Sequence, residues 1–152
     1  FEHNLQKEIF VCQIDLAVKY KKKIIIHTRE SFDDVTQILD GYKGRVTGII
    51  HCFSGNQDQM KKLINLGFLI SFAGNITYGK NSSMLESLKN CPLESLLIET
   101  DSPYLAPAGL RGQQNFPAYI PETYNFISEI KKIKLEKLSE IAVNNFGKLW
   151  EK

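Results

Sequence analysis

Four short apolar runs alternate with helical patterns along this 152-residue chain. The first run, at 24–26, is three isoleucines with no polar residue until His27. Such a run is typical of a strand that is buried on both faces of a parallel sheet. Further strands are expected at 46–53, 68–72 and 96–101. This alternation predicts βαβ units with helices outside the sheet, in either an open doubly wound sheet or part of a closed (β/α)8 barrel.

The helical patterns are amphipathic stripes between and around these runs. The first stripe recurs at i, i+4, i+7 and i+11 and comprises Leu5, Ile9, Cys12 and Leu16. Further helices are expected near 35–42, 60–64 and 83–89. A helix starting near Pro121 is expected before a last helix, whose apolar residues are Leu138, Ile141, Ala142, Phe146 and Leu149.

The composition fits one ordinary globular domain over residues 1–152. With 43% hydrophobic residues, 24% charged residues and a net charge of +2, the chain is neither disordered nor polybasic. Three widely spaced cysteines favour reduced thiols over a disulfide framework. No apolar run approaches the roughly 18 residues of a membrane span, and Phe1 is not followed by a signal-peptide pattern. We therefore expect a cytoplasmic protein without membrane partners.

Polar residues end three of the apolar runs. His27 and His51 lie 24 positions apart, and Asp101 follows 50 positions later, as expected for one and two steps of a βα repeat. Strand alternation places all three side chains on the same face, at the carboxyl ends where parallel α/β folds carry their sites. Imidazole and carboxylate are ligands for Zn²⁺, Mn²⁺, Fe²⁺ or, with more oxygen ligands, Mg²⁺. The alternative is that each histidine is an ordinary hydrogen-bonded residue.

Other polar residues near these strand ends allow two interpretations each. Glu99 is either part of the site or a buried carboxylate held by a hydrogen-bonding partner. Arg29 and Arg111 lie in loops after strands, where each could clamp a phosphate or form a loop salt bridge. Ser54 could cap the next helix or donate to a bound anion. By contrast, the run 21–23 of three lysines precedes its strand and is interpreted as a solvated helix end.

The motifs around these residues resemble the TatD family of metal-dependent deoxyribonucleases. They are QKEIFVCQIDLA at 6–17, IIIHTR at 24–29, HCFSG at 51–55, ISFAG at 70–74 and ETDSPYLAP at 99–107, followed by Arg111-Gly112 and Asn115-Phe116-Pro117. The resemblance implies a metal-dependent hydrolase of DNA phosphodiester bonds with one or two Mg²⁺, Mn²⁺ or Zn²⁺ ions. It implies that His27, His51 and Asp101 are metal ligands and that Asp101 also orients or deprotonates the attacking water. Glu99 then supports the ligands, and Arg29, Ser54 and Arg111 bind substrate.

The chain lacks the family's His-x-His pair and its metal-bridging glutamate. The resemblance therefore implies the C-terminal half, about four βα units, of a (β/α)8 TIM-type barrel, belonging to a longer enzyme or to half of an assembly. Two alternatives remain: a metal hydrolase of small amides, esters or acyl-tRNA, and an inert fragment that self-associates through its open edges. An Fe²⁺ oxygenase with two histidines and one carboxylate is a weaker rival.

Overall fold

Four parallel strands form one sheet at the centre of the molecule. The structure is a computed structural model and describes residues 2–79 and 82–151. Its strands are β1 (Ile24–His27), β2 (Gly48–His51), β3 (Phe68–Phe72) and β4 (Leu96–Ile98), paired in the order β1-β2-β3-β4. The first and third strands have the predicted bounds, whereas β2 and β4 are shorter than the apolar runs that predicted them.

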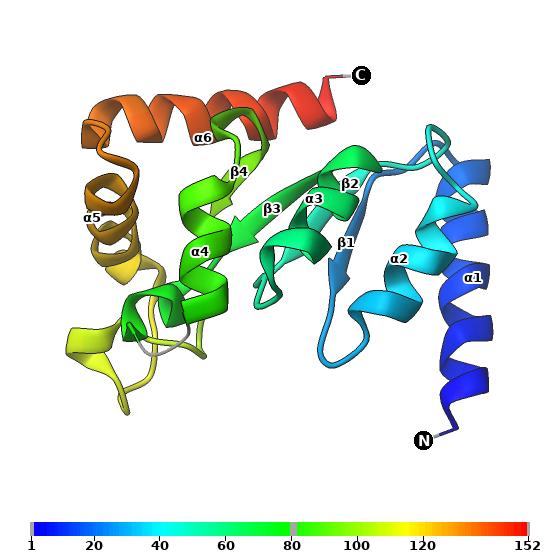
Figure 1. Cartoon of the computed structure of the whole chain (residues 1–152), viewed down its shortest axis with the longest axis horizontal. Helices are drawn as coiled ribbons and strands as arrows, with labels where there is room; N and C mark the ends of the chain where they lie inside the picture. Colours follow the sequence, from blue (N-terminus) through cyan, green and yellow to red (C-terminus); the bar gives the residue numbers. More distant parts are fainter. Residues whose placement is uncertain (1, 80–81, 152) are drawn as a thin grey trace.

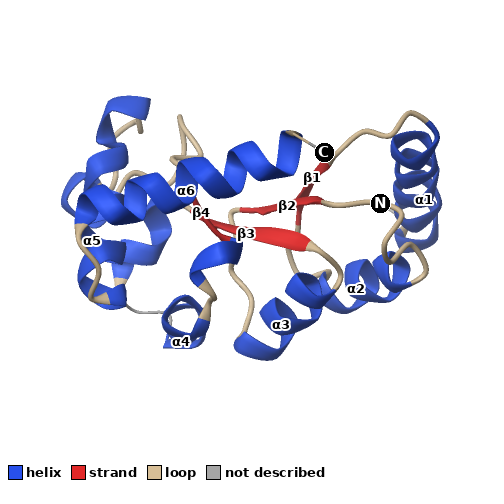
Figure 2. Ribbon diagram, turned by 90° about the horizontal axis from the view of Figure 1, so that it is seen from above, coloured by secondary structure: helices blue, strands red, loops and turns tan. Residues whose placement is uncertain are grey.

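Six α-helices within the described residues surround this sheet. They are α1 (His3–Lys19), α2 (Phe32–Asp40), α3 (Gln57–Asn65), α4 (Ser82–Asn90), α5 (Ile120–Lys131) and α6 (Leu135–Trp150). Helices α1 and α2 lie beside β1, α5 lies at the opposite end of the molecule, and α6 runs from that end across the sheet (Figure 1). In the view from above, α2, α3 and α4 lie on one side of the sheet and α6 lies on the other (Figure 2).

The main core lies between the sheet and the layer of α2, α3 and α4. Ile26, Ile50, Ile70 and Leu96 are aligned across the four strands, and all are buried on this face. Burying such a side chain contributes roughly 1.5–3 kcal/mol relative to leaving it exposed. This row therefore fixes which residues of each strand point to the opposite face.

The opposite face carries Ile49 and Leu97, which pack with Leu149 of α6 in a second, smaller cluster. Ile25, aligned with Ile49 on the edge strand, is 64% exposed. Helix α6 therefore covers the part of this face over β2 and β4, while the β1 end stays open to solvent.

The prediction of half a (β/α)8 barrel is wrong. The described strands form an open four-stranded parallel sheet, with β1 and β4 as its two edges, and the fold is a partial α/β fold. Neighbouring strands rotate by only about 20–25°, so four strands twist into an open sheet. Closure would require the two edges to pair.

The apolar stripe at the start of the chain faces solvent. Leu5, Ile9 and Leu16 are about half exposed, whereas Ile14 and Ala17 of the same helix are buried. Helix α1 has apolar residues on two faces, so periodicity alone does not distinguish the face that meets α2 and β1. In the last helix, Leu138, Ala142 and Leu149 are buried as their stripe suggests, but Phe146 is 51% exposed. No helix within the described residues is long and apolar enough to cross a membrane.

Candidate active site

The predicted site residues of the first two strands meet at the carboxyl end of the sheet. His27 and His51 are aligned across β1 and β2, and their ring centroids are 5.5 Å apart. His27 is exposed because it lies on the edge strand, whereas the His51 side chain is only 23% exposed. The alternation argument therefore placed both imidazoles on the same face correctly.

His51 lies between two carboxylates. Its Nδ1 is 2.5 Å from Oε2 of Glu99, and its Nε2 is 3.3 Å from Oδ1 of Asp101. The second oxygen of Glu99 accepts a hydrogen bond of 2.6 Å from the backbone N–H of Cys52. Both carboxylate side chains are three-quarters buried. Glu99 is thus held by hydrogen-bonding partners, and it links the ends of β2 and β4.

Two residues at the strand ends adopt the left-handed backbone conformation. Cys52, directly after β2, has φ 48°, and Asp101, three residues after β4, has φ 56°. This region costs a non-glycine residue about 1–2 kcal/mol, and such residues cluster at functional sites. At Cys52 the turn directs the backbone N–H to Glu99, so the local strain accompanies a contact that orders the site.

The Cys52 thiol is buried beside this cluster. Burial raises its pKa from 9.0 to about 12, and the neighbouring charges of Asp101 and Glu99 add to the shift. The thiolate, which is the nucleophilic and metal-binding form, is therefore disfavoured at this position.

Asn115 holds the loop after β4, a role that the sequence analysis did not assign although the residue lies in a quoted motif. Its side-chain amide donates to the carbonyls of Thr100 and Tyr104, each at 2.7 Å, and its backbone N–H donates to Pro103. The side chain is buried, and an amide between two carbonyls on either side of Asp101 fixes that segment. The sequence signal that could have found it is its place in the motif Asn115-Phe116-Pro117, within the loop that follows Asp101.

Three buried oxygens near the strand ends make no hydrogen bond to the described residues. They are Oγ1 of Thr28, which follows His27, Oγ of Ser102, which follows Asp101, and Oδ1 of Asn115. Leaving a buried polar atom without a partner costs about 1–3 kcal/mol. Their position beside His27 and Asp101 fits a site that takes up water or a polar ligand.

The residues predicted to bind substrate are distributed less tightly. Arg29 is exposed in the loop after β1. The Arg111 guanidinium stacks over the Tyr78 ring, with its central carbon 4.7 Å from the ring centroid. Ser54 is exposed, and the prediction that it caps the next helix is wrong. Asn56 caps α3 instead. It occupies the N-cap position, and its side chain accepts a hydrogen bond from the backbone N–H of Gln59.

The donor atoms at His51 and Asp101 fit a shared cation. When Nδ1–H of His51 donates to Glu99, Nε2 of the neutral ring presents a lone pair toward an Asp101 oxygen. These two electron-rich atoms repel each other, and a proton or metal ion between them removes that repulsion. Two ligands of one tetrahedral ion, each about 2.1 Å from it, lie about 3.4 Å apart, close to the observed 3.3 Å. No group of three or more His, Cys, Asp or Glu side chains within residues 2–79 and 82–151 is arranged to hold a metal ion. The role of His27 as a third ligand therefore stays a prediction.

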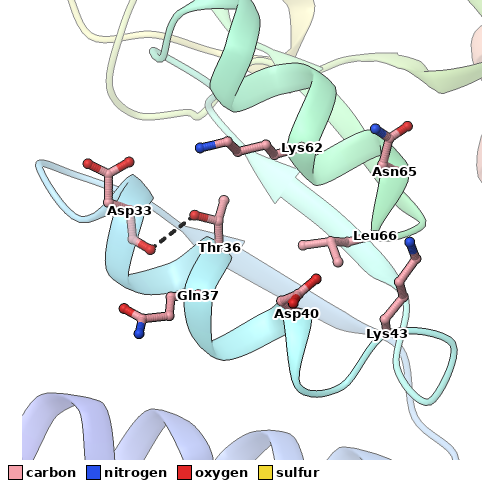
Figure 3. A pocket seen from close by; sticks show the side chains of 8 residues that line it. All are labelled: Asp33, Thr36, Gln37, Asp40, Lys43, Lys62, Asn65 and Leu66. Carbon is pink, nitrogen blue, oxygen red and sulfur yellow. Dashed lines mark hydrogen bonds between the residues drawn. The ribbon is translucent and has the colours of Figure 1, made fainter.

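A cavity of about 560 Å³ lies apart from these residues, between α2 and α3 (Figure 3). Asp33 and Asp40 of α2 lie on one side of it, and Lys62 of α3 lies on the other. Thr36 points into the same region, but its hydroxyl donates a hydrogen bond of 3.0 Å to the carbonyl of Asp33. The cavity contains none of the predicted site residues, and its mixed charges select no ligand class.

Comparison with known proteins gives a consistent set of relatives. The family model described as TatD related DNase matches residues 2–151. An uncharacterized metal-dependent hydrolase of Buchnera aphidicola is 38% identical over 147 residues, which is 96% of this chain and 56% of that protein. The uncharacterized metal-dependent hydrolase YcfH of Escherichia coli is 36% identical over 95% of this chain and 55% of its own length.

Solved structures agree with the sequence relatives. The TatD homologue YjjV from Escherichia coli has a TM-score of 0.85 and 29% identity, over 92% of this chain and 54% of that chain. An uncharacterized amidohydrolase from Saccharomyces cerevisiae has a TM-score of 0.84 over 97% of this chain and 60% of its own, but at 18% identity it shows the fold alone. The chain thus spans about half the length of the curated relatives it matches, which agrees with a partial α/β fold.

Proposed function

The chain belongs to the family of TatD-related DNases, and on this premise we propose that it is the part of a metal-dependent phosphodiesterase that acts on DNA and supplies the carboxyl-end cluster of His27, His51, Glu99 and Asp101. The observation that carries the proposal is the placement of His51 between two carboxylates, each facing one ring nitrogen. The relatives named as metal-dependent hydrolases support the metal requirement.

In this proposal His27, His51 and Asp101 hold one divalent ion of the Mg²⁺, Mn²⁺ or Zn²⁺ class. Such an ion polarises a phosphate oxygen and lowers the pKa of a water molecule when it is bound. The donor types are those that these ions accept in proteins.

Glu99 sets the state of His51. By accepting from Nδ1–H it fixes the tautomer in which Nε2 keeps its lone pair and faces Asp101. The same carboxylate is held by the Cys52 N–H, so the imidazole plane is fixed by the backbone of the β2 end. Asp101 then has one oxygen toward His51, and its carboxylate can hold and accept a proton from the attacking water.

Arg29 and Ser54, both exposed on loops after β1 and β2, supply donors for the non-bridging phosphate oxygens. Arg111 is given the same role from the loop after β4, where Tyr78 supports its guanidinium face and leaves the planar N–H groups for an anion. These three side chains are assigned to substrate binding and not to proton transfer.

A cleavage assay tests the proposal directly. End-labelled single-stranded and double-stranded DNA is incubated with the 152-residue chain and Mg²⁺, Mn²⁺ or Zn²⁺, with EDTA as the metal-free control, and products are separated by length. We expect cleavage that requires a metal ion and is lost in His51→Ala. The exposed Glu136 on α6 provides a control, since Glu136→Ala should cleave as the wild type does.

Substrate comparison separates the proposal from the second metal-hydrolase hypothesis. The same preparations are assayed on small amides and esters and on acyl-tRNA. Faster turnover of any of these than of DNA would refute the DNase assignment but keep the metal site. Absence of metal-dependent hydrolysis of every substrate would refute both for this chain.

A further inference from the structure

The amino ends of the strands form a second polar edge, opposite the candidate active site. A cavity of about 170 Å³ lies there between the segment before β1 and the segment before β2. Lys21, Lys22, Lys23 and Arg45 line it, together with small or apolar residues. We call these four cations the basic edge. Among the described residues that line the cavity, none is acidic.

The charge of the basic edge is not neutralised locally. The sequence has no Asp or Glu between Asp15 and Glu30, and none between Asp40 and Asp58. Asp15, which borders the region, accepts a 2.7 Å hydrogen bond from the Tyr42 hydroxyl. None of the ion pairs found among residues 2–79 and 82–151 includes a cation of the basic edge. A group of unpaired cations around one cavity is an electrostatic footprint for an anion.

Two of these cations are held in place by neighbouring residues. Nζ of Lys23 donates to Oγ1 of Thr47 at 3.1 Å, and Arg45 donates to the carbonyl of Gly41 at 2.5 Å. The Arg45 guanidinium also lies over the Tyr42 ring, 4.5 Å from its centroid. Less side-chain entropy is therefore lost when these groups contact a ligand.

One exposed and one half-buried aromatic residue accompany the cations. Tyr20, directly before Lys21, is 60% exposed, and Lys19 lies 5.4 Å from its ring centroid. Tyr42 flanks the cavity on the other side through its contact with Arg45. Cations combined with an exposed aromatic ring, here that of Tyr20, suit nucleic acid, since phosphates pair with the cations and a base stacks on the ring.

We propose that the basic edge is a second, non-catalytic binding surface for the backbone of single-stranded nucleic acid. Strand β1 is four residues long, so at about 3.3 Å per residue the edge lies about 13 Å from the carboxyl ends of the strands. Nucleic acid bound here contacts neither His51 nor Asp101. The inference therefore stands on contacts separate from those of the proposed hydrolase.

Fluorescence anisotropy of a labelled 20-nucleotide oligo(dT) in EDTA and 50 mM salt tests the proposal without cleavage. The triple variant Lys21→Asn, Lys22→Gln and Arg45→Gln should bind at least about ten-fold more weakly than the wild type. Asn is chosen to replace Lys21 because the backbone at this position is left-handed, with φ 51°, and Asn adopts that conformation more readily than Gln. Each lost phosphate contact reduces the magnitude of the negative slope of log K against log salt by about 0.7. The magnitude of the slope should therefore fall by about 2 in the triple variant.

The matched control removes three exposed lysines elsewhere, through Lys61→Gln, Lys62→Gln and Lys134→Gln. It should bind within two-fold of the wild type. Equal affinity of the wild type and the triple variant, or equal losses in the triple and control variants, would overturn the proposal. A thermal melt of each variant verifies folding, and the single variant Lys22→Gln, expected to bind about two- to three-fold more weakly, replaces the triple variant if the latter is unfolded.

Two further arms separate the remaining possibilities. Vesicles containing phosphatidylserine test a membrane surface as the source of the phosphates, and tighter binding to these vesicles than to the oligonucleotide would overturn the nucleic-acid assignment. Asp101→Asn should retain oligonucleotide binding within two-fold, because the basic edge is distant from Asp101. Wild-type binding with no metal-dependent cleavage would refute the proposed hydrolase and leave this inference standing.

Discussion

The two ends of the central sheet differ in how their charges are neutralised. At the carboxyl end, His51 contacts Glu99 and Asp101, and all three side chains are mostly buried. At the amino end, Lys21, Lys22 and Arg45 are exposed and have no carboxylate partner among the described residues. The same strands carry both ends, so the difference comes from the residues that flank them.

The contrast between the two ends relates the exposure of polar groups to what they can do. Groups that must hold a fixed protonation state and geometry are enclosed and in contact with one another, as at the carboxyl end. Groups that attract a polyanion work at a distance and need exposure, as at the amino end. Variants that affect one end and spare the other are therefore the sharpest tests.

The largest effect is expected for Asp101→Asn. The amide keeps the size of the side chain but cannot accept a proton from water, so DNA cleavage should fall by roughly 10³-fold or more. Product formation in single-turnover assays measures this change. Asp58→Asn on the exposed start of α3 is the control. Wild-type cleavage by Asp101→Asn would remove Asp101 from the mechanism.

A substitution at the first residue of β2 should damage both ends of the sheet, because it separates two paired strands. A Cβ at Gly48 would lie 1.8 Å from the carbonyl oxygen of Ile24 on the paired strand, so β1 and β2 must move apart. We expect Gly48→Ala to lower the free energy of unfolding by about 3 kcal/mol, measured in urea. Gly109→Ala, where a Cβ meets nothing within 4 Å, should be neutral. Unchanged stability of Gly48→Ala would contradict this packing.

Glu99→Gln should affect only the carboxyl end. The Gln carbonyl can still accept from Cys52, but its NH₂ group then faces Nδ1 of His51 and favours the tautomer that carries its proton on Nε2. Metal affinity should fall by about 10–100-fold, measured by calorimetry, with NMR of the imidazole nitrogens reporting the tautomer. Glu94→Gln, exposed near β4, should bind metal normally. An unchanged tautomer in Glu99→Gln would show that Glu99 does not orient His51.

Near neutral pH, the smallest expected effect concerns the buried thiols, because their contribution to stability changes only above about pH 9. Burial is the main cause that raises the pKa of Cys52 and of Cys91 from 9.0 to about 12. The unfolded chain releases these protons first as the pH rises, so the stabilising contribution is complete below pH 9 and is lost between pH 9 and about 12. Urea titrations at several pH values should show a shallower loss in Cys52→Ala than in the wild type. Cys12→Ser, at an exposed thiol, should follow the wild-type profile.

Local sequence patterns predicted the parts of the fold that depend on buried strands. The runs at 24–27 and 68–72 became β1 and β3 with the expected bounds, and alternation placed His27 beside His51. Patterns failed where two choices have similar local energy. Helix α1 has two apolar faces, and only packing against α2 and β1 buries Ile14 and exposes Ile9.

The candidate site was predictable in its residue types but not in its contacts. Spacing brought His51 and Asp101 to one edge, but the link from Glu99 to the Cys52 N–H depends on a left-handed residue after β2. The same limit explains the missed role of Asn115, because its two carbonyl partners become neighbours only when the loop after β4 folds back. The assignment to half a (β/α)8 barrel was wrong because repeating βα units indicate a parallel sheet without fixing whether it belongs to an open sheet or a barrel.

The left-handed backbone at Asp101 determines which residues can replace this aspartate during evolution without unfolding the protein. Asparagine and glycine are the residues best suited to that conformation, and each is one base change from an aspartate codon. Replacement of Asp101 by either residue is therefore expected to leave the protein folded. A gene duplicate that loses its chemistry in this way keeps its surfaces, so natural selection can retain it as a binding protein.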